Sequence, residues 1–241
     1  MTMETEKKLI VDGVRVDGRK WDELRDIKMK VGVLKNAIGS ASVEWGKNKV
    51  IAGVYGPREV IPKFEEDSTK AILKCEYNMA PFSVEDRKRP GPDRRSVEIS
   101  KVITEALSSV VLLEEFPNTQ INVYIEILRA DAGTRIAGIT AASLALADAG
   151  VPMKDLVAGC TSGKVDGEIV LDLCKEEDNY GDCDLPVAII PKNKEIVLLQ
   201  MDGILTKEEF NKAFDLVVDG AMNVYEMQKK ALYEKYKNKD E

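Results

Sequence analysis

The sequence predicts an α+β protein made of two related halves. Runs of β-forming residues are followed by a helical pattern twice along the 241 residues, once before and once after Pro152. No low-complexity linker and no Pro/Ser-rich hinge separates the two patterns, and 44% hydrophobic residues suffice for a sizeable core. We therefore expect residues 1–152 and 153–241 to form two β-sheet and helix subdomains fused in one compact unit.

The first half is expected to begin with an antiparallel meander. Three β-rich runs are separated by turn-forming compositions: residues 27–34, 40–45 and 50–55. A fourth strand is predicted over residues 71–79, because apolar and charged side chains alternate there and Pro81 follows. Ser96 is a good N-cap residue and opens a helix whose apolar stripe should pack on the meander.

The remaining elements repeat the pattern of strands followed by a helix. Residues 121–128 alternate as a strand does, and a helix of small residues then runs to Ala149, where Gly150 and Pro152 stop it. In the second half, strands are expected near residues 157–162, 168–173, 185–190 and 195–200. A long final helix begins at Thr206, where Thr206 and Glu209 form a capping box.

The bulk composition excludes several classes of protein. No window holds the ~20 consecutive apolar residues of a membrane span, and the first residues are charged where a signal peptide is apolar. We therefore expect a cytoplasmic protein with no membrane contact. The net charge of −7 argues against coating nucleic acid by bulk charge, so any RNA site must rest on local clusters of Lys and Arg.

The chain contains no histidine, and this narrows the chemistry. Ser-His-Asp and Cys-His arrangements are impossible, so general acid work falls to carboxylates, Lys or Tyr. The four cysteines are scattered and form no C-x-x-C pair: Cys75, Cys160, Cys174 and Cys183. They indicate reduced structural thiols and no zinc site.

An anion site is expected at residues 131–135 (Asp-Ala-Gly-Thr-Arg), where a strand leads into a helix. N–H groups at a helix start point outward and, with the helix dipole, attract anions. Gly133 lets an anion approach the backbone, Thr134 adds a hydroxyl, and Arg135 can grip phosphate oxygens in bidentate fashion. The alternative is an ordinary capped helix with a surface arginine that binds nothing.

Two charged clusters flank this junction in the sequence. Residues 87–95 carry five positive charges against one negative charge, and Arg94 and Arg95 stand at a helix entry. Two positive charges there are unfavourable unless an anion joins them, so the pair is either solvated or phosphate-binding. The acidic residues 176–184 include Asp178 and Asp184, which could hold a hard cation such as Mg²⁺ or form a solvated turn.

Together, an anion site, an arginine pair and an acidic pair are the parts that phosphoryl transfer requires. Arginines and a cation offset the repulsion between an anionic nucleophile and a phosphodiester, and a carboxylic acid or metal-bound water protonates the departing 3′ oxygen. Inorganic phosphate is already a nucleophile and needs no histidine base. The residues are therefore those that a phosphoryl-transfer site requires, and inorganic phosphate can serve there as the attacking group.

Several motifs resemble, in order and spacing, those of the RNase PH family, and within it the archaeal exosome branch. They are DGR at 17–19, ELR at 23–25, YGPR at 55–58, RRSVEI at 94–99, ADAGTR at 130–135, AASLALADAG at 141–150 and DLP at 184–186. The match extends from about Val11 into the final helix. The resemblance implies an RNase PH-like fold of paired sheet and helix units.

The resemblance also implies an activity and partners. The activity is processive 3′ to 5′ phosphorolysis of single-stranded RNA ends to nucleoside diphosphates, with inorganic phosphate as co-substrate and Mg²⁺ as cofactor. The partners are a homologous inactive RNase PH-like subunit, which alternates with this one in a hexameric ring, and RNA-binding cap subunits. The rival interpretations are a homomeric bacterial-type RNase PH that trims tRNA 3′ ends, and a non-catalytic RNA-binding ring subunit.

Site roles follow from the matched motifs. Gly133, Thr134 and Arg135 would bind the attacking phosphate, Arg94 and Arg95 would hold the RNA backbone, and Asp178 and Asp184 would supply acid catalysis and metal binding. Lys63 and Arg87 are further candidates for RNA contact. At position 63 many family members carry arginine, and lysine keeps the charge but lacks the bidentate fork.

Overall fold

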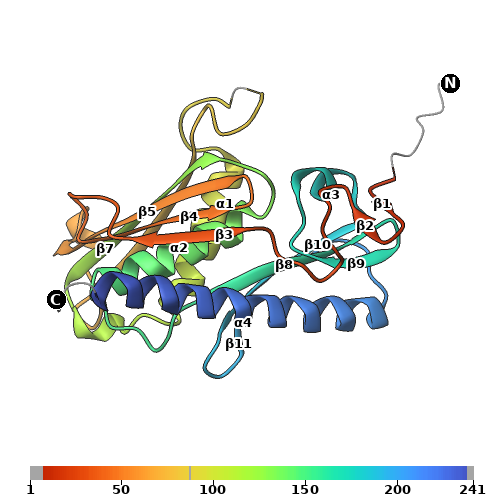
Figure 1. The fold of residues 1–241 in the computed structure, drawn as a ribbon. Helices are drawn as coiled ribbons and strands as arrows, with labels where there is room; N and C mark the ends of the chain where they lie inside the picture. Colours follow the sequence, from red (N-terminus) through yellow and green to blue (C-terminus); the bar gives the residue numbers. More distant parts are fainter. Residues whose placement is uncertain (1–7, 87, 238–241) are drawn as a thin grey trace.

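The computed structural model describes residues 8–86 and 88–237, and it contains two large sheets (Figure 1). The first sheet has the strand order β3-β4-β5-β7-β6. Its strands are β3 Ile27–Val31, β4 Gly39–Trp45, β5 Asn48–Glu59, β6 Ile72–Met79 and β7 Thr119–Arg129. The predicted antiparallel meander is confirmed, because β4 pairs antiparallel with both β3 and β5.

The fourth strand does not extend the meander. β6 lies at the sheet edge and pairs parallel with β7, and α1 (Arg94–Ser108) joins the two. A parallel pair needs a long crossover, and α1 is the main part of it. The N-cap of α1 is Asp93 and not Ser96 as expected: the Asp93 carboxylate accepts a hydrogen bond from the Ser96 N–H at 2.7 Å.

Helix α2 (Thr134–Asp148) is buried over residues 136–146, and it contacts strands of both sheets. Small residues permit this close packing. A Cβ added at Gly138 would lie 3.4 Å from Ile125 Cγ2 in β7 and 3.6 Å from Ile103 Cδ1 in α1. The start of α2 is therefore held firmly at the junction between the two sheets.

The second sheet has the strand order β11-β10-β8-β9, and the short β12 also pairs with β10. Its strands are β8 Ala158–Val165, β9 Glu168–Leu171, β10 Cys183–Ile190, β11 Glu195–Leu199 and β12 Asp202–Gly203. The long helix α4 (Lys207–Lys237) runs beneath both sheets (Figure 1). Its predicted capping box is confirmed, because the Thr206 N–H donates to Glu209 and the Glu209 N–H donates to Thr206.

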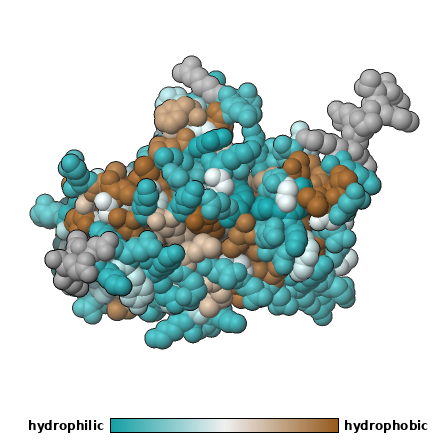
Figure 2. Space-filling view, in the orientation of Figure 1, coloured by the Kyte–Doolittle hydropathy of each residue, from teal (hydrophilic) through white to brown (hydrophobic). Residues whose placement is uncertain are grey.

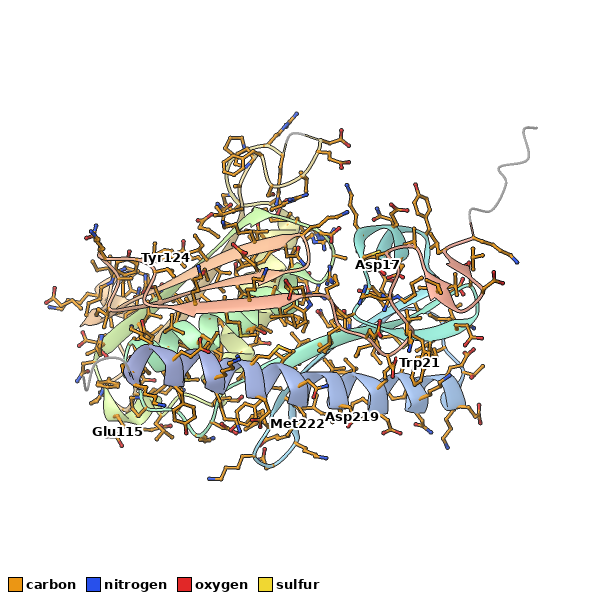
Figure 3. The ribbon with its side chains drawn as sticks, in the orientation of Figure 1. Asp17, Trp21, Glu115, Tyr124, Asp219 and Met222 are labelled. Atoms are coloured by element: carbon orange, nitrogen blue, oxygen red, sulfur yellow. The ribbon has the colours of Figure 1, made fainter. Side chains whose placement is uncertain are left out.

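Residues 9–25, which we name the N-terminal strap, pack on the second half of the chain although the sequence division placed them with the first. The strap contains the β1–β2 hairpin (Ile10–Val11 and Val14–Arg15). Leu9 joins a small apolar cluster with Val165, Val170 and Leu173. Figure 3 shows Asp17 beside the second sheet and Trp21 close to α4, where Lys212 Nζ lies 5.7 Å from the centre of the Trp21 ring.

The acidic stretch forms a short helix, α3 (Lys175–Tyr180), where the sequence suggested a turn. Glu177 is fully buried, and its carboxylate accepts hydrogen bonds from Arg15 Nε at 2.7 Å and from the Cys174 N–H at 2.9 Å. This ion pair joins α3 to the N-terminal strap. Two 3-10 turns, η1 Lys63–Glu65 and η2 Leu113–Glu115, complete the elements.

The surface in Figure 2 is largely hydrophilic, with hydrophobic patches over parts of the first sheet and around the β1–β2 hairpin. Val11, Val14 and Val16 are exposed in or beside that hairpin. Within the described ranges, no helix is both long enough and apolar enough to cross a membrane. All four cysteines are buried free thiols, as the sequence predicted.

Candidate active site

A polar pocket of about 440 Å³ lies where α1, the start of α2, α3 and the second sheet meet. Residues from five separate segments line it: Arg95, Glu98, Arg135, Asp178, Asp184, Pro186, Gln200, Met201 and Asp202. Arg135 and Asp184, which lie in different halves of the chain, therefore face one shared cavity. The predicted convergence of the basic and acidic segments is observed.

Residues 131–135, which we name the phosphate loop for the role that the sequence predicts, reach this pocket through Arg135, whereas Gly133 and Thr134 are not among its lining residues. Ala132 and Gly133 both have left-handed backbone angles, with φ of +55° and +65°, so the chain turns sharply into α2. Gly133 is the N-cap and offers no side chain to the helix, which leaves the first N–H groups of α2 open to an anion. A side chain at Gly133 would be strained, and its Cβ would lie 3.3 Å from Arg25 Nη2.

Thr134 and Arg135 follow in the first turn of α2. The Thr134 hydroxyl is buried and accepts a hydrogen bond from the Tyr77 hydroxyl at 2.8 Å, so its own hydrogen is free to be donated elsewhere. The Arg135 side chain is 20% exposed, and its Nη2 lies 3.8 Å from Glu98 Oε2. Among the residues described, its buried Nε has no hydrogen-bond partner, which is unfavourable unless a ligand supplies one.

Three carboxylates form the opposite wall. Asp178 comes from α3 and Asp184 from β10, and Asp202 in β12 is the direct cross-strand partner of Asp184. Partial burial raises the pKa of the Asp178 carboxyl, and the positive charge of Arg95 lowers it by a smaller amount. Burial also raises the pKa of Asp184, and the negative charges of Asp178 and Asp202 add to that increase. Like charges facing each other across strands destabilise a sheet, which is typical of a functional site.

The RNA-binding candidates are distributed unevenly. Arg95 lines the pocket, whereas Arg94, its neighbour at the start of α1, is exposed and does not. The Asp93 cap carries a negative charge beside this pair, and it is itself paired with Lys88 at 3.0 Å. Lys63 is exposed in η1, on the connection from β5 to β6, and also lies outside the pocket lining. Arg87 lies outside the described residues.

Sequence reasoning missed Glu98, Gln200, Met201 and Asp202 as pocket residues. Glu98 had a usable signal, since it lies three residues after Arg95 and so on the same helix face. Gln200 follows β11, and its Nε2 donates to Glu98 Oε1 at 3.0 Å. The position of Asp202 depends on the pairing of β12 with β10, which nothing local in the sequence indicates.

The acidic wall is suited to a hard cation, although it is not a complete protein cage. Within the described ranges, no cluster of three or more His, Cys, Asp or Glu side chains has the geometry to hold a metal ion. Mg²⁺ commonly takes one or two carboxylates and completes its shell with water and substrate phosphates. Asp178 and Asp184 fit that requirement as a pair of oxygen donors beside an anion site.

The pocket sets two arginines opposite paired acids, an arrangement expected of an enzyme that acts on phosphate groups. Residues 23–152 match the model of the 3′ exoribonuclease family, domain 1, and residues 155–220 match domain 2 of the same family. The chain belongs to this family, the RNase PH family, and is a phosphorolytic 3′ to 5′ exoribonuclease.

Relatives and solved structures agree with this assignment. The chain is 69% identical over 225 residues to "Exosome complex component Rrp41" of Thermococcus kodakarensis, covering 93% of this chain and 90% of the relative. It is 65% identical over 238 residues to the component of that name from Pyrococcus furiosus, covering 98% and 95%.

Two solved structures share the fold. Rice (Oryza sativa) Rrp46 superposes with a TM-score of 0.81 at 24% identity, covering 90% of this chain and 99% of that one. A chain of the Archaeoglobus fulgidus exosome with RNA bound to the active site superposes with a TM-score of 0.76 at 27% identity, covering 89% and 92%. The predicted RNase PH-like α+β fold is thereby confirmed.

Proposed function

We propose that this chain is the catalytic subunit of an archaeal exosome, and that the pocket between Arg135 and Asp184 is where it shortens RNA from the 3′ end. The observation that carries the proposal is the convergence of Arg135, Arg95 and two aspartates on one cavity. The high identity to Rrp41 proteins over nearly the whole chain supports the exosome assignment over the homomeric tRNA-trimming enzyme.

The two walls of the pocket have different roles: the basic wall binds the phosphate groups, and the acidic wall assists the leaving group. Inorganic phosphate binds at the first N–H groups of α2, with Thr134 and Arg135 as donors, and Arg95 holds the last phosphodiester of the RNA. With both anions held by positive groups, a phosphate oxygen attacks the phosphorus of that diester. The new P–O bond forms as the bond to the 3′ oxygen of the preceding nucleotide breaks, which releases a nucleoside diphosphate.

The acidic wall assists the departing oxygen. Burial raises the pKa of Asp178 and of Asp184, and this suits one carboxyl of the pair to pass a proton to the leaving 3′ oxygen while the other stays ionised. Asp178 and Asp184 would hold Mg²⁺, which when bound supplies positive charge to the phosphate oxygens. Because phosphate and not water is the attacking group, the reaction is phosphorolysis, and it runs backwards as RNA tailing when diphosphates are abundant.

The proposal extends to the assembly. An alternating hexameric ring with an inactive RNase PH-like subunit, topped by RNA-binding cap subunits, would deliver a single-stranded 3′ end to this pocket. Exposed Arg94 and Lys63 would then contact RNA from outside the pocket. The isolated chain is expected to show poor activity that rises when the partner subunit is added.

One assay tests the proposal. End-labelled single-stranded RNA is incubated with the chain, alone and with its partner subunit, in Mg²⁺ buffer with and without phosphate. Nucleoside diphosphates that appear only with phosphate support it, and loss of activity on chelation with recovery on adding Mg²⁺ supports the metal role. Monophosphate products that need no phosphate would contradict it, and full activity of the chain alone would contradict the alternating ring.

A further inference from the structure

Two arginines of the N-terminal strap, Arg15 and the ELR-motif residue Arg25, are held in a buried network behind the pocket. Arg15 and Arg25 are 3% and 8% exposed, and neither lines the pocket. Their partners are three acidic residues from distant parts of the chain: Asp131, Asp172 and Glu177. Desolvating so many charges is costly, so the network needs a reason beyond stability.

Arg25 contacts the phosphate loop directly from behind. Its Nη1 donates to the main-chain oxygen of Asp131 and lies 3.4 Å from the Asp131 carboxylate. The same guanidinium group lies under Gly133, where an added Cβ would come within 3.3 Å of Nη2. Asn48 holds the loop from the other side, because its amide accepts from the Asp131 N–H and donates to the Ala132 oxygen. The loop is thus shaped by side chains that phosphate never touches.

Arg25 is bound at the same time to the second half of the chain. Its side-chain Nη2 and Nε donate to Asp172 Oδ1 and Oδ2 at 2.7 and 3.1 Å. The backbone N–H of Arg25 also donates to Asp172 Oδ2, at 2.8 Å. Trp45 Nε1 donates to the same carboxylate at 2.9 Å. Asp172 follows β9 and lies three residues before α3, the helix that carries Asp178.

We propose that Arg25 is a positioning residue for phosphorolysis, and that through its pair with Asp172 it fixes the phosphate loop relative to the acidic wall. The inference rests on the proposed function of the pocket. The attacking phosphate and the acids are carried by different halves, so their separation depends on what joins those halves. A shift of about 1 Å at a reacting centre is enough to lose on the order of 100-fold in rate.

Arg15 provides a matched control, since it is also a buried arginine of the strap but holds only the acidic side. It binds both oxygens of Glu177, next to Asp178, and the main-chain oxygens of Leu171 and Asp172. It makes no contact with the phosphate loop. Arg25 and Arg15 therefore separate phosphate positioning from the placement of the acids.

The experiment compares Arg25→Lys and Arg15→Lys, each assembled with wild-type partner subunits into the full complex. The measurements are made at temperatures where thermal melting shows both variants folded. Lysine cannot bind Asp172 and the Asp131 oxygen together, so Arg25→Lys should raise the KM for phosphate on the order of tenfold to 100-fold with RNA affinity unchanged. Arg15→Lys should lower kcat and leave the KM for phosphate within about twofold. Trp45→Phe, a milder change that removes one bond to Asp172, should raise the KM for phosphate by less.

Two results would overturn the inference: an unaltered KM for phosphate in Arg25→Lys and Trp45→Phe, or an equal rise in Arg15→Lys. Either result would mean that the buried network stabilises the fold and does not position the attacking phosphate. Absence of phosphate-dependent diphosphate release by the wild-type complex is a different result, because it removes the proposed function and this inference with it.

Discussion

Replacing Arg135 by lysine tests the anion wall most directly. The Arg135 side chain is 20% exposed, its Nε is buried without a partner among the described residues, and its contact to Glu98 is 3.8 Å. Phosphate binding would give these N–H groups acceptors that they lack. Arg135→Lys keeps the charge but loses the planar fork, and one lost charge-assisted hydrogen bond costs about 1.5–3 kcal/mol.

That cost converts to roughly a 10- to 150-fold increase in the KM for phosphate, at about 1.4 kcal/mol for each factor of ten. The measurement is the initial rate of diphosphate release against phosphate concentration at saturating RNA, with RNA affinity measured separately. Glu98→Gln is the companion variant. It removes the carboxylate that competes with phosphate for Arg135, so the KM for phosphate should fall.

The two changes in KM must have opposite signs. An unchanged KM for phosphate in Arg135→Lys, or a loss confined to RNA affinity, would refute the assignment of Arg135 to the attacking phosphate. A higher KM in Glu98→Gln would show that Glu98 orients Arg135 and does not compete with the ligand.

Three further outcomes are expected. The double variant Arg94→Ala, Arg95→Ala should weaken RNA binding and lower the slope of log affinity against log salt by about 1.4, at about 0.7 for each phosphate contact to a single strand, as titrations at several salt concentrations would show. Asp184→Asn should abolish turnover and keep RNA affinity. It should also raise the melting temperature at neutral pH, because the raised pKa of Asp184 means that its ionised form is disfavoured in the folded state; this gain should shrink as the pH falls and the native carboxyl takes up its proton. Thr206→Ala should cost about 1 kcal/mol in chemical denaturation, through loss of the α4 cap.

Local signals in the sequence predicted much of the fold. The meander follows from three β-rich runs with turns between them, and the capping box at Thr206 needs only residues within one helical turn. Ser96 shows the limit of such signals. Asp93 is an equally good cap residue three positions earlier, and sequence preference alone did not decide between them.

What the sequence could not predict depends on contacts between distant residues. β6 pairs parallel with β7 because of how the chain crosses over, and the strap packs on the second half because Arg15 finds a partner 162 residues away. In the site, Arg135 stands in the first turn of a helix, and this local feature was enough to predict it as a candidate before the pocket was known. Asp202 becomes part of the pocket only through strand pairing, so its role had no local sign.

The reach of the N-terminal strap has a consequence for how the polypeptide is made. Arg15 leaves the ribosome 162 residues before Glu177, its buried partner. At about 5–20 residues per second, that interval lasts roughly 8–30 s, during which Arg15 stays hydrated without Glu177 to pair with. Arg15 and Arg25 can both reach their acidic partners only once the chain has been made through α3, so the phosphate loop acquires its final support late in translation.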